Sequence, residues 1–78
     1  MSKKAIRLTF PKARIKEPVI YNLGHKFKIV TNIKRANITH DEGWVVLELD
    51  GEQREIDNGI NWLMSLGIKI APVGVEEN

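Results

Sequence analysis

Two asparagines, Asn32 and Asn37, stand in a stretch that otherwise favours a β-strand. Asparagine is depleted in strands, and its side chain offers both hydrogen-bond donors and an acceptor. It can therefore bind the ammonium and carboxylate groups of an amino acid, with Ile33 and Ile38 as an apolar wall. The alternative is that both amides only hydrogen-bond the nearby backbone. The spacing of the two residues favours this alternative slightly.

The chain offers few groups for catalysis or for metal binding. It has no cysteine, and neither Ser2 nor Ser65 has a histidine or an acid at a catalytic spacing. His25 lies near the expected end of a helix, where a cation interacts well with the helix dipole. The run His40-Asp41-Glu42 is typical of a solvated turn, because three adjacent residues cannot all face one ion. No glycine-rich phosphate loop is present, so we expect no enzyme, no bound metal and no cofactor.

Charge is distributed unevenly along the 78 residues, although the net charge is only +2. Residues 1–40 hold most of the lysines and arginines, and residues 41–78 hold nearly all of the acids. A basic half could bind nucleic acid, but the paired aromatic residues of an RNA-binding sheet are missing. Lys12, Arg14 and Lys16 could still form a local anion patch. We expect no nucleic-acid partner.

The length predicts a single domain over residues 1–78, with a core at about 4–73 and a frayed tail at 74–78. No apolar run approaches the length of a membrane span, and no signal peptide follows Met1. We therefore predict a cytoplasmic protein without membrane insertion. A core this small is marginal in a monomer, which favours a homo-oligomer.

The elements that must position these residues follow from apolar periodicity. The pattern predicts strands with a period of two and helices with a period of 3.6. Asp50 could cap the second helix, with Gln53 three residues later, and Gly67 would end it. The expected elements are a strand at 4–10, a helix at 17–27, a strand at 28–39, a hairpin loop at 40–43 with Gly43 at positive φ, a strand at 44–49, a helix from 50–51 to 67, and a strand from 68 that Pro72 limits.

This order, β-α-β-β-α-β, predicts an α+β fold of the ferredoxin-like type. Right-handed crossovers give a four-stranded antiparallel sheet of order 4-1-3-2, with both helices on one face. Gly24 could mark a place where the first helix approaches the sheet closely. A switch of parity between Ile33 and Ala36 predicts a β-bulge in the second strand.

The other face of the predicted sheet has no covering element. The alternation places Ala5, Arg7 and Thr9 there, together with Trp44 and Val46. We further expect the bulge to send either Ile33 or Ile38 to this face. An exposed tryptophan beside a valine indicates a contact patch, so we predict a homodimer through Trp44 and Val46, or through an edge strand.

The run from Asn32 to Ile38, Asn-Ile-Lys-Arg-Ala-Asn-Ile, resembles the signature of the NIL domain family. Three later segments resemble the same family in order and spacing: 44–51, 60–63 and 67–70. Lys34 departs from the pattern, since leucine is typical there, and we expect this position to face water. The segment 10–21 looks closer to the members associated with ferredoxins.

The resemblance implies a regulatory domain found at the C-terminus of ATPase subunits of methionine ABC importers, where it dimerises and binds methionine. The family also occurs fused to 4Fe–4S ferredoxin modules. This chain has no Walker motif and no cysteine, so the resemblance implies a stand-alone sensing or docking domain. We predict a ligand such as methionine near Asn32, Ile33, Asn37 and Ile38. The alternative is an accessory module for a separate ferredoxin or sulfur-transfer enzyme, and an ABC-transporter-type partner is a further expectation.

Overall fold

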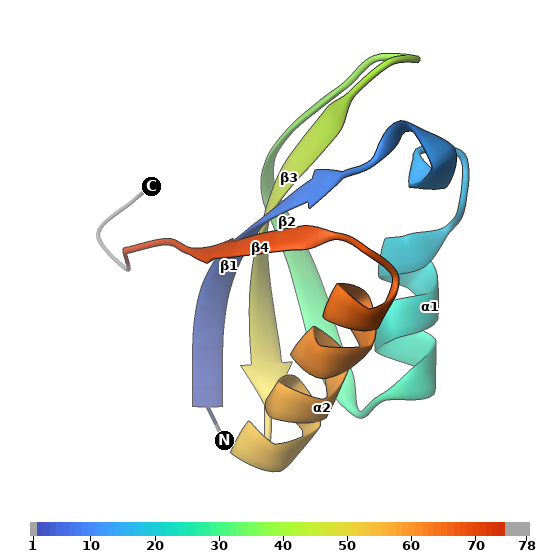
Figure 1. Ribbon diagram of the computed structural model, residues 1–78. Coiled ribbons are helices and arrows are strands. Elements are labelled where there is room, and N and C mark those ends of the chain that lie inside the picture. The colour runs from blue at the N-terminus through green and yellow to red at the C-terminus, as the bar shows by residue number, and fades with distance from the viewer. Residues whose placement is uncertain (1, 75–78) are drawn as a thin grey trace.

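The computed structural model describes residues 2–74, which form a four-stranded antiparallel sheet and two helices (Figure 1). The predicted α+β fold is confirmed, because the observed order β2-β3-β1-β4 is the order 4-1-3-2 read from the other edge. Of the predicted tail, 75–78 lies outside the described residues. The elements are β1 (Ser2–Phe10), the 3-10 helix η1 (Lys12–Arg14), α1 (Val19–Lys26), β2 (Ile29–Ile38), β3 (Gly43–Gly51), α2 (Gln53–Ser65) and β4 (Lys69–Pro72).

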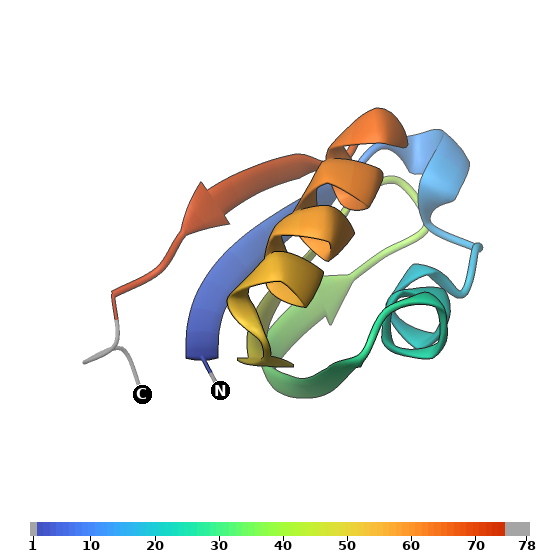
Figure 2. The same ribbon diagram turned by 90° about the horizontal axis from the view of Figure 1, so that it is seen from below.

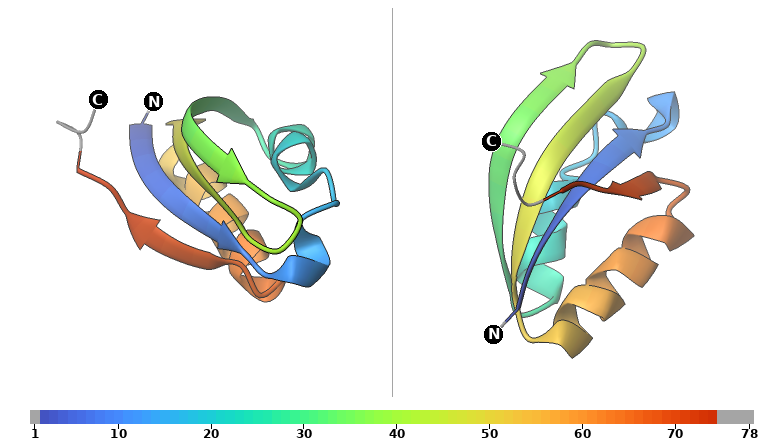
Figure 3. Two further views of the ribbon diagram at one scale, coloured as in Figure 1. Left: turned by 90° about the horizontal axis from the view of Figure 1, so that it is seen from above. Right: turned by 90° about the vertical axis from the view of Figure 1, so that its left-hand side faces the viewer.

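Both helices lie on the same side of the sheet, and its other side is uncovered by any described element (Figures 1 and 2). The right-hand view of Figure 3 faces the uncovered side, with the strands in front of the helices. We call this side the open face and the opposite side the helix face. No helix within residues 2–74 combines the length and apolarity needed to cross a membrane.

Alternating apolar residues of the two central strands build the core between the sheet and the helices. Ile6 and Leu8 of β1 and Leu47 of β3 are at most 1% exposed, whereas the residues between them point to the open face. The helices contribute apolar residues at helical spacing, which is why they pack here. The buried core is Ile6, Leu8, Phe10, Val19, Leu23, Ile29, Val45, Leu47, Leu49, Ile56, Leu63 and Ile68.

Helix α2 packs tightly against β2 and α1 at Gly59. A Cβ atom at this position would lie 2.8 Å from Cδ1 of Ile29 and 3.0 Å from Cδ1 of Leu23. At Gly24, which the sequence offered as the close approach, a Cβ would make only ordinary contacts, the nearest at 3.5 Å. The tighter approach is therefore at Gly59 of the second helix and not at Gly24 of the first.

The predicted helix cap at Asp50 is wrong. Strand β3 continues to Gly51, and Asp50 pairs with Lys3 of β1 and with Val30 of β2. Helix α2 begins at Gln53 without a side-chain cap, and the Gln53 amide donates to Asp57 Oδ1 at 2.9 Å. Two flanking strands supply partners for the Asp50 backbone, so the ladder outweighs the local capping signal.

The β-bulge is confirmed, with the register shifting between Ile33 and Arg35 and with Lys34 exposed. The expectation that Ile33 or Ile38 joins the open face is wrong, however. Ile33 pairs with Leu47 and Ile38 pairs with Gly43, so both lie on the helix face. The extra residue in the bulge shifts the in-and-out alternation of β2 by one position. Ile33, at an odd position, and Ile38, at an even one, therefore lie on the same side of the sheet.

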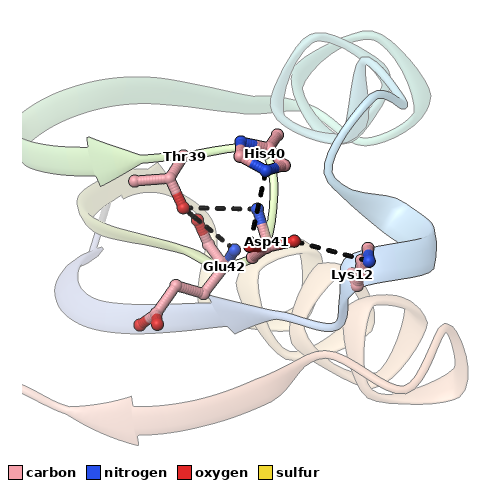
Figure 4. A network of polar contacts seen from close by, with 5 residues as sticks. All are labelled: Lys12, Thr39, His40, Asp41 and Glu42. Atoms are coloured by element: carbon pink, nitrogen blue, oxygen red, sulfur yellow. Dashed lines mark hydrogen bonds and ion pairs between the residues drawn. The ribbon is translucent and has the colours of Figure 1, made fainter.

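The β2–β3 hairpin turns through residues 39–42 (Figure 4). Thr39 Oγ1 accepts hydrogen bonds from the backbone N–H of Asp41 and Glu42, at 3.3 and 3.1 Å, and donates to the Glu42 carbonyl at 3.1 Å. Asp41 also lies 3.4 Å from both Lys12 Nζ and His40 Nε2. The predicted positive φ at Gly43 is wrong, because Thr39 closes the turn and Gly43 is already extended in β3. Among the described residues, positive φ occurs only at Gly67, after α2.

The two edges of the sheet differ. Strand β2 presents a ten-residue outer edge, whereas β4 has only four residues. The Val73 N–H donates to the Ala5 carbonyl of β1 at 3.0 Å. Because successive peptide groups alternate in direction, the nitrogen of Pro72 faces outward, where its missing N–H removes no bond from the ladder.

Candidate functional site

The open face is organised in rows of side chains that run across the strands. Residues that pair directly in an antiparallel sheet share a face and are neighbours. We name three adjacent rows by their most distinctive member. They are the tryptophan row (Thr9, Trp44, Asn37), the arginine row (Arg7, Val46, Arg35) and the glutamate row (Ala5, Glu48, Asn32).

Trp44 and Val46 share this face, as the sequence predicts, but the patch is not purely apolar. The Arg7 guanidinium carbon lies 4.4 Å from the centre of the Trp44 ring, a cation–π arrangement. Trp44 and Val46 are only partly exposed. Their role as a dimer interface therefore stays a prediction. The surface in question already holds the Arg7 guanidinium stacked on Trp44.

A hollow of about 390 Å³ lies on the open face beside β4. Arg7 and Arg35, the two charged residues of the arginine row, border this hollow. No ion pair within residues 2–74 includes either of them. Its remaining lining is largely apolar side chain and strand backbone. The full lining is Arg7, Arg35, Trp44, Val46, Ala71, Pro72, Val73 and Gly74.

The structure divides the four predicted ligand residues between two faces. Asn32 and Asn37 lie on the open face, on either side of the arginine row, whereas Ile33 and Ile38 lie on the helix face. All four side chains are exposed. Within one chain, the asparagines therefore share a surface with Trp44 but not with the two isoleucines.

The structure does not support the alternative that Asn32 and Asn37 only hydrogen-bond the nearby backbone. Within residues 2–74, neither Asn32 nor Asn37 makes a side-chain hydrogen bond to the backbone or to another side chain. Backbone pairing with β3 on both sides of the bulge, and not a contact of a side-chain amide, therefore holds this segment in place. Both amides are thus available to an external ligand.

Sequence reasoning missed two charged neighbours of these amides. Arg35 follows the bulge and pairs with Val46, and Glu48 pairs with Asn32. The sequence alternation within each strand indicates which residues share a face. The alignment of Arg35 and Glu48 with Arg7, however, depends on the register across three strands. Only the position of the bulge decides that Arg35, and not Lys34, joins the open face.

On the helix face, exposed apolar side chains gather along β2 and the adjoining α1. Tyr21 is 68% exposed, and Ile33 and Ile38 are each 55% exposed. We call these three residues the β2 strip. Ile38 and Tyr21 also border a second, mostly apolar hollow of about 200 Å³ beneath the hairpin. Because this strip adjoins a free strand edge, it is a candidate contact surface for another chain.

The histidines and acids do not gather into a metal centre. Among residues 2–74, no group of three or more potential ligands of the His, Cys, Asp or Glu type is close enough to hold an ion. His25 lies in the last turn of α1, as expected, and its ring stacks on Tyr21 with 5.4 Å between the ring centres.

Comparison with known proteins gives consistent matches over nearly the whole chain. The model of the NIL domain family matches residues 4–72. The methionine import ATP-binding protein MetN of Helicobacter pylori is 33% identical over 73 residues, which cover 88% of this chain and 22% of that protein. The crystal structure of the C-terminal domain of an ABC transporter/ATP-binding protein from Enterococcus faecalis superposes with a TM-score of 0.80 at 26% identity, covering 94% of this chain and 86% of that one. The chain thus spans about a fifth of the length of its curated relative.

Proposed function

Because this chain belongs to the NIL domain family, we propose that it is a non-catalytic regulatory domain that binds methionine or a related sulfur amino acid. The observation that carries the proposal is the similarity to a C-terminal domain of an ATP-binding transporter protein. The name of the Helicobacter relative, a methionine import protein, supports methionine as the first ligand to test. The proposal keeps the domain in the cytoplasm, as the sequence predicts.

The geometry of the open face supports a small polar ligand. Asn32 and Asn37 offer unengaged amides on either side of Val46, and Trp44 supplies an aromatic wall. A thioether side chain favours contact with such a wall, since sulfur packs well against aromatic rings. Ile33 and Ile38 can contribute to the same site only from another chain or another surface.

A second copy of the chain is the proposed oligomeric partner. We favour the edge of β2 with the β2 strip over the patch at Trp44 and Val46, because the strip is more exposed and no guanidinium stacks on it. Strand addition at β2 would pair backbone groups that now face solvent. An ATP-binding transporter subunit is the proposed downstream partner, and a ferredoxin or a sulfur-transfer enzyme is the alternative.

Titration calorimetry with L-methionine, L-homocysteine and L-cysteine at millimolar concentration tests the ligand. We expect saturable heat with at least one of them, and none with L-lysine, whose ammonium end would be repelled by the guanidinium of Arg7 beside Trp44. Absence of heat with all three sulfur amino acids contradicts the sensor proposal. Co-purification of a redox or sulfur-transfer protein with the chain from native extract would then support the docking alternative.

A further inference from the structure

Two adjacent rows of the open face carry cations and no acidic residue. Arg7 and Arg35 stand in the arginine row, and Lys69 extends the tryptophan row onto β4. Acidic residues follow only beyond these rows, with Glu42 in the hairpin turn on one side and Glu48 in the glutamate row on the other. We call the two rows, with Arg7, Arg35 and Lys69 as their charged members, the basic band.

The cations of the basic band have no anionic partner among residues 2–74. No ion pair or side-chain hydrogen bond within this part of the chain includes Arg7, Arg35 or Lys69, and all three are exposed. Both arginines border the hollow beside β4, whereas neither Glu42 nor Glu48 does. The hollow is therefore lined by positive charge alone, which favours an anionic occupant.

One of the two guanidiniums is already held in place. The guanidinium carbon of Arg7 lies 4.4 Å from the centre of the Trp44 ring. Stacking covers the flat side of a guanidinium and leaves its N–H edge free for a planar acceptor, and a carboxylate suits this edge. Because the stacked side chain has less freedom to lose, binding to it costs less conformational entropy.

The rest of the hollow is lined mainly by apolar side chains of β3 and of the segment at β4. A free inorganic anion would leave this surface in contact with water. A polypeptide segment that carries an aliphatic residue among its carboxylates would cover it, and the apolar area removed from water would add to the binding free energy. The apolar side chains concerned are Val46, Ala71, Pro72 and Val73.

Other macromolecular occupants suit the basic band less well. A base of single-stranded nucleic acid would need the Trp44 ring for stacking, and Arg7 already occupies a face of that ring. The charged backbone of a nucleic acid would also continue past the band toward Glu42 or Glu48. A second copy of the chain offers only the same cations at its own band, and like charges in apposition disfavour association.

We propose that the basic band is a docking surface for an acidic, extended segment of a partner protein. Carboxylates of the segment bind Arg7 and Arg35, and an aliphatic side chain lies over Val46 and Pro72. Lys69 adds attraction from β4. Pairing of two copies through the edge of β2 leaves the open face uncovered, so docking is compatible with self-association. The proposal does not depend on the amino-acid ligand of the preceding subsection.

Fluorescence anisotropy tests the proposal with the full chain and a defined probe. The probe is the fluorescein-labelled peptide Glu-Glu-Leu-Glu-Glu, and its matched control is Gln-Gln-Leu-Gln-Gln, which has nearly the same volume and no side-chain charge. A labelled oligothymidylate of similar length represents single-stranded nucleic acid. The titrations contain no free amino acid and are run at physiological ionic strength, where salt screens weak, non-specific attraction. We expect saturable binding of the glutamate peptide alone.

Two double variants locate the binding surface. Arg7→Met with Arg35→Met should weaken binding of the glutamate peptide at least ~10-fold, because charge-assisted hydrogen bonds are lost. Lys16→Met with Lys28→Met removes the same charge from exposed positions outside the band, and neither lysine belongs to an ion pair within residues 2–74. This control should bind like the wild type. Circular dichroism establishes folding, and Arg35→Met alone, expected to weaken binding several-fold, replaces a double variant that unfolds.

Four results would overturn the proposal: no binding of the glutamate peptide by the wild type, equal binding of the glutamine peptide, equal losses in the arginine and lysine variants, or tighter binding of the oligothymidylate. The last result would assign the band to nucleic acid. Because no amino acid is present, none of these results bears on the sensing role. Conversely, a chain that docks the glutamate peptide but binds no sulfur amino acid would retain the docking surface and lose the sensing role.

Discussion

The Nε–H of Arg14 donates a hydrogen bond to the backbone carbonyl of Leu66 at 3.1 Å, across 52 positions of sequence. The same guanidinium donates from Nη1 to both carboxylate oxygens of Glu17, at 2.9 and 3.1 Å. Leu66 is the residue directly after α2, at its C-terminal cap, and the last carbonyls of a helix have no partner within the helix. Arg14 therefore joins the loop before α1 to the negative end of α2.

The first prediction concerns this contact. Arg14→Met should lower the free energy of unfolding by about 1–2 kcal/mol, because it removes a hydrogen bond from a charged donor and leaves a helix-end carbonyl without it. Lys12→Met in the same 3-10 helix should cost about 0–1 kcal/mol, since its ion pair with Asp41 is exposed. Urea denaturation measures both, and equal losses in the two variants would show that the Leu66 contact contributes nothing.

The second prediction concerns Gly59. Gly59→Ala should destabilise the domain by about 1–3 kcal/mol through overpacking against Ile29 and Leu23, although alanine favours a helix by about 1 kcal/mol. The adjacent Asn58→Ala, at an exposed position of the same helix, should be neutral or stabilising. Thermal unfolding followed by circular dichroism compares them. A gain in stability at both positions would mean that α2 does not approach β2 as closely as described.

The third prediction concerns self-association. We expect a dimer at micromolar concentration by sedimentation equilibrium, and Ile33→Lys should raise its dissociation constant at least ~10-fold, because it puts a charge in the β2 strip. Met64→Lys is the control, since Met64 is similarly exposed, at 58%, but lies on α2.

Val46→Lys decides between the two surfaces considered for the dimer. It should leave the dimer intact if the edge of β2 forms the contact, and should dissociate it if the patch at Trp44 and Val46 does. A wild-type chain that stays monomeric at every concentration, with and without methionine, would exclude both.

The fourth prediction concerns the asparagines. Asn32→Ala and Asn37→Ala should each weaken binding of methionine about tenfold, because a polar group of the bound ligand then loses its partner. Asn61→Ala, at an exposed position on α2, should have no effect. Calorimetric titration of the three variants provides the comparison. Unchanged affinity in both strand variants would place the site elsewhere on the domain.

Much of the fold was predictable because two kinds of signal agree over long segments. Leu8 and Leu47 stand in strict alternations that favour half-buried strands, and the helices between them show a period of 3.6 residues. The structure differs from the predicted one where a local sequence signal competes with long-range strand pairing. Asp50 is a good cap by residue type, and Gly43 is a good turn residue, but the ladder between β1, β2 and β3 includes both of them.

The candidate site was less predictable, because its members come from three strands. Residue type alone singled out Asn32 and Asn37, and alternation placed Arg7 and Trp44 on one face. The alignment of Arg7, Arg35 and Glu48 depends on cross-strand register, which a bulge shifts by one position. Strict alternation would place Ile33 and Ile38 on opposite faces, but the extra residue at Lys34 returns both to the helix face.

The unequal edges of the sheet limit how large an assembly of this chain can become. At β4, the outward-facing nitrogen of Pro72 cannot donate to an incoming strand, so sheet extension is disfavoured there. At β2, the long edge can accept one further strand, and an antiparallel β2–β2 pair uses the same edge of both copies. Such a contact is isologous and closes on itself. The domain can therefore pair through its sheet without polymerising into open-ended fibres.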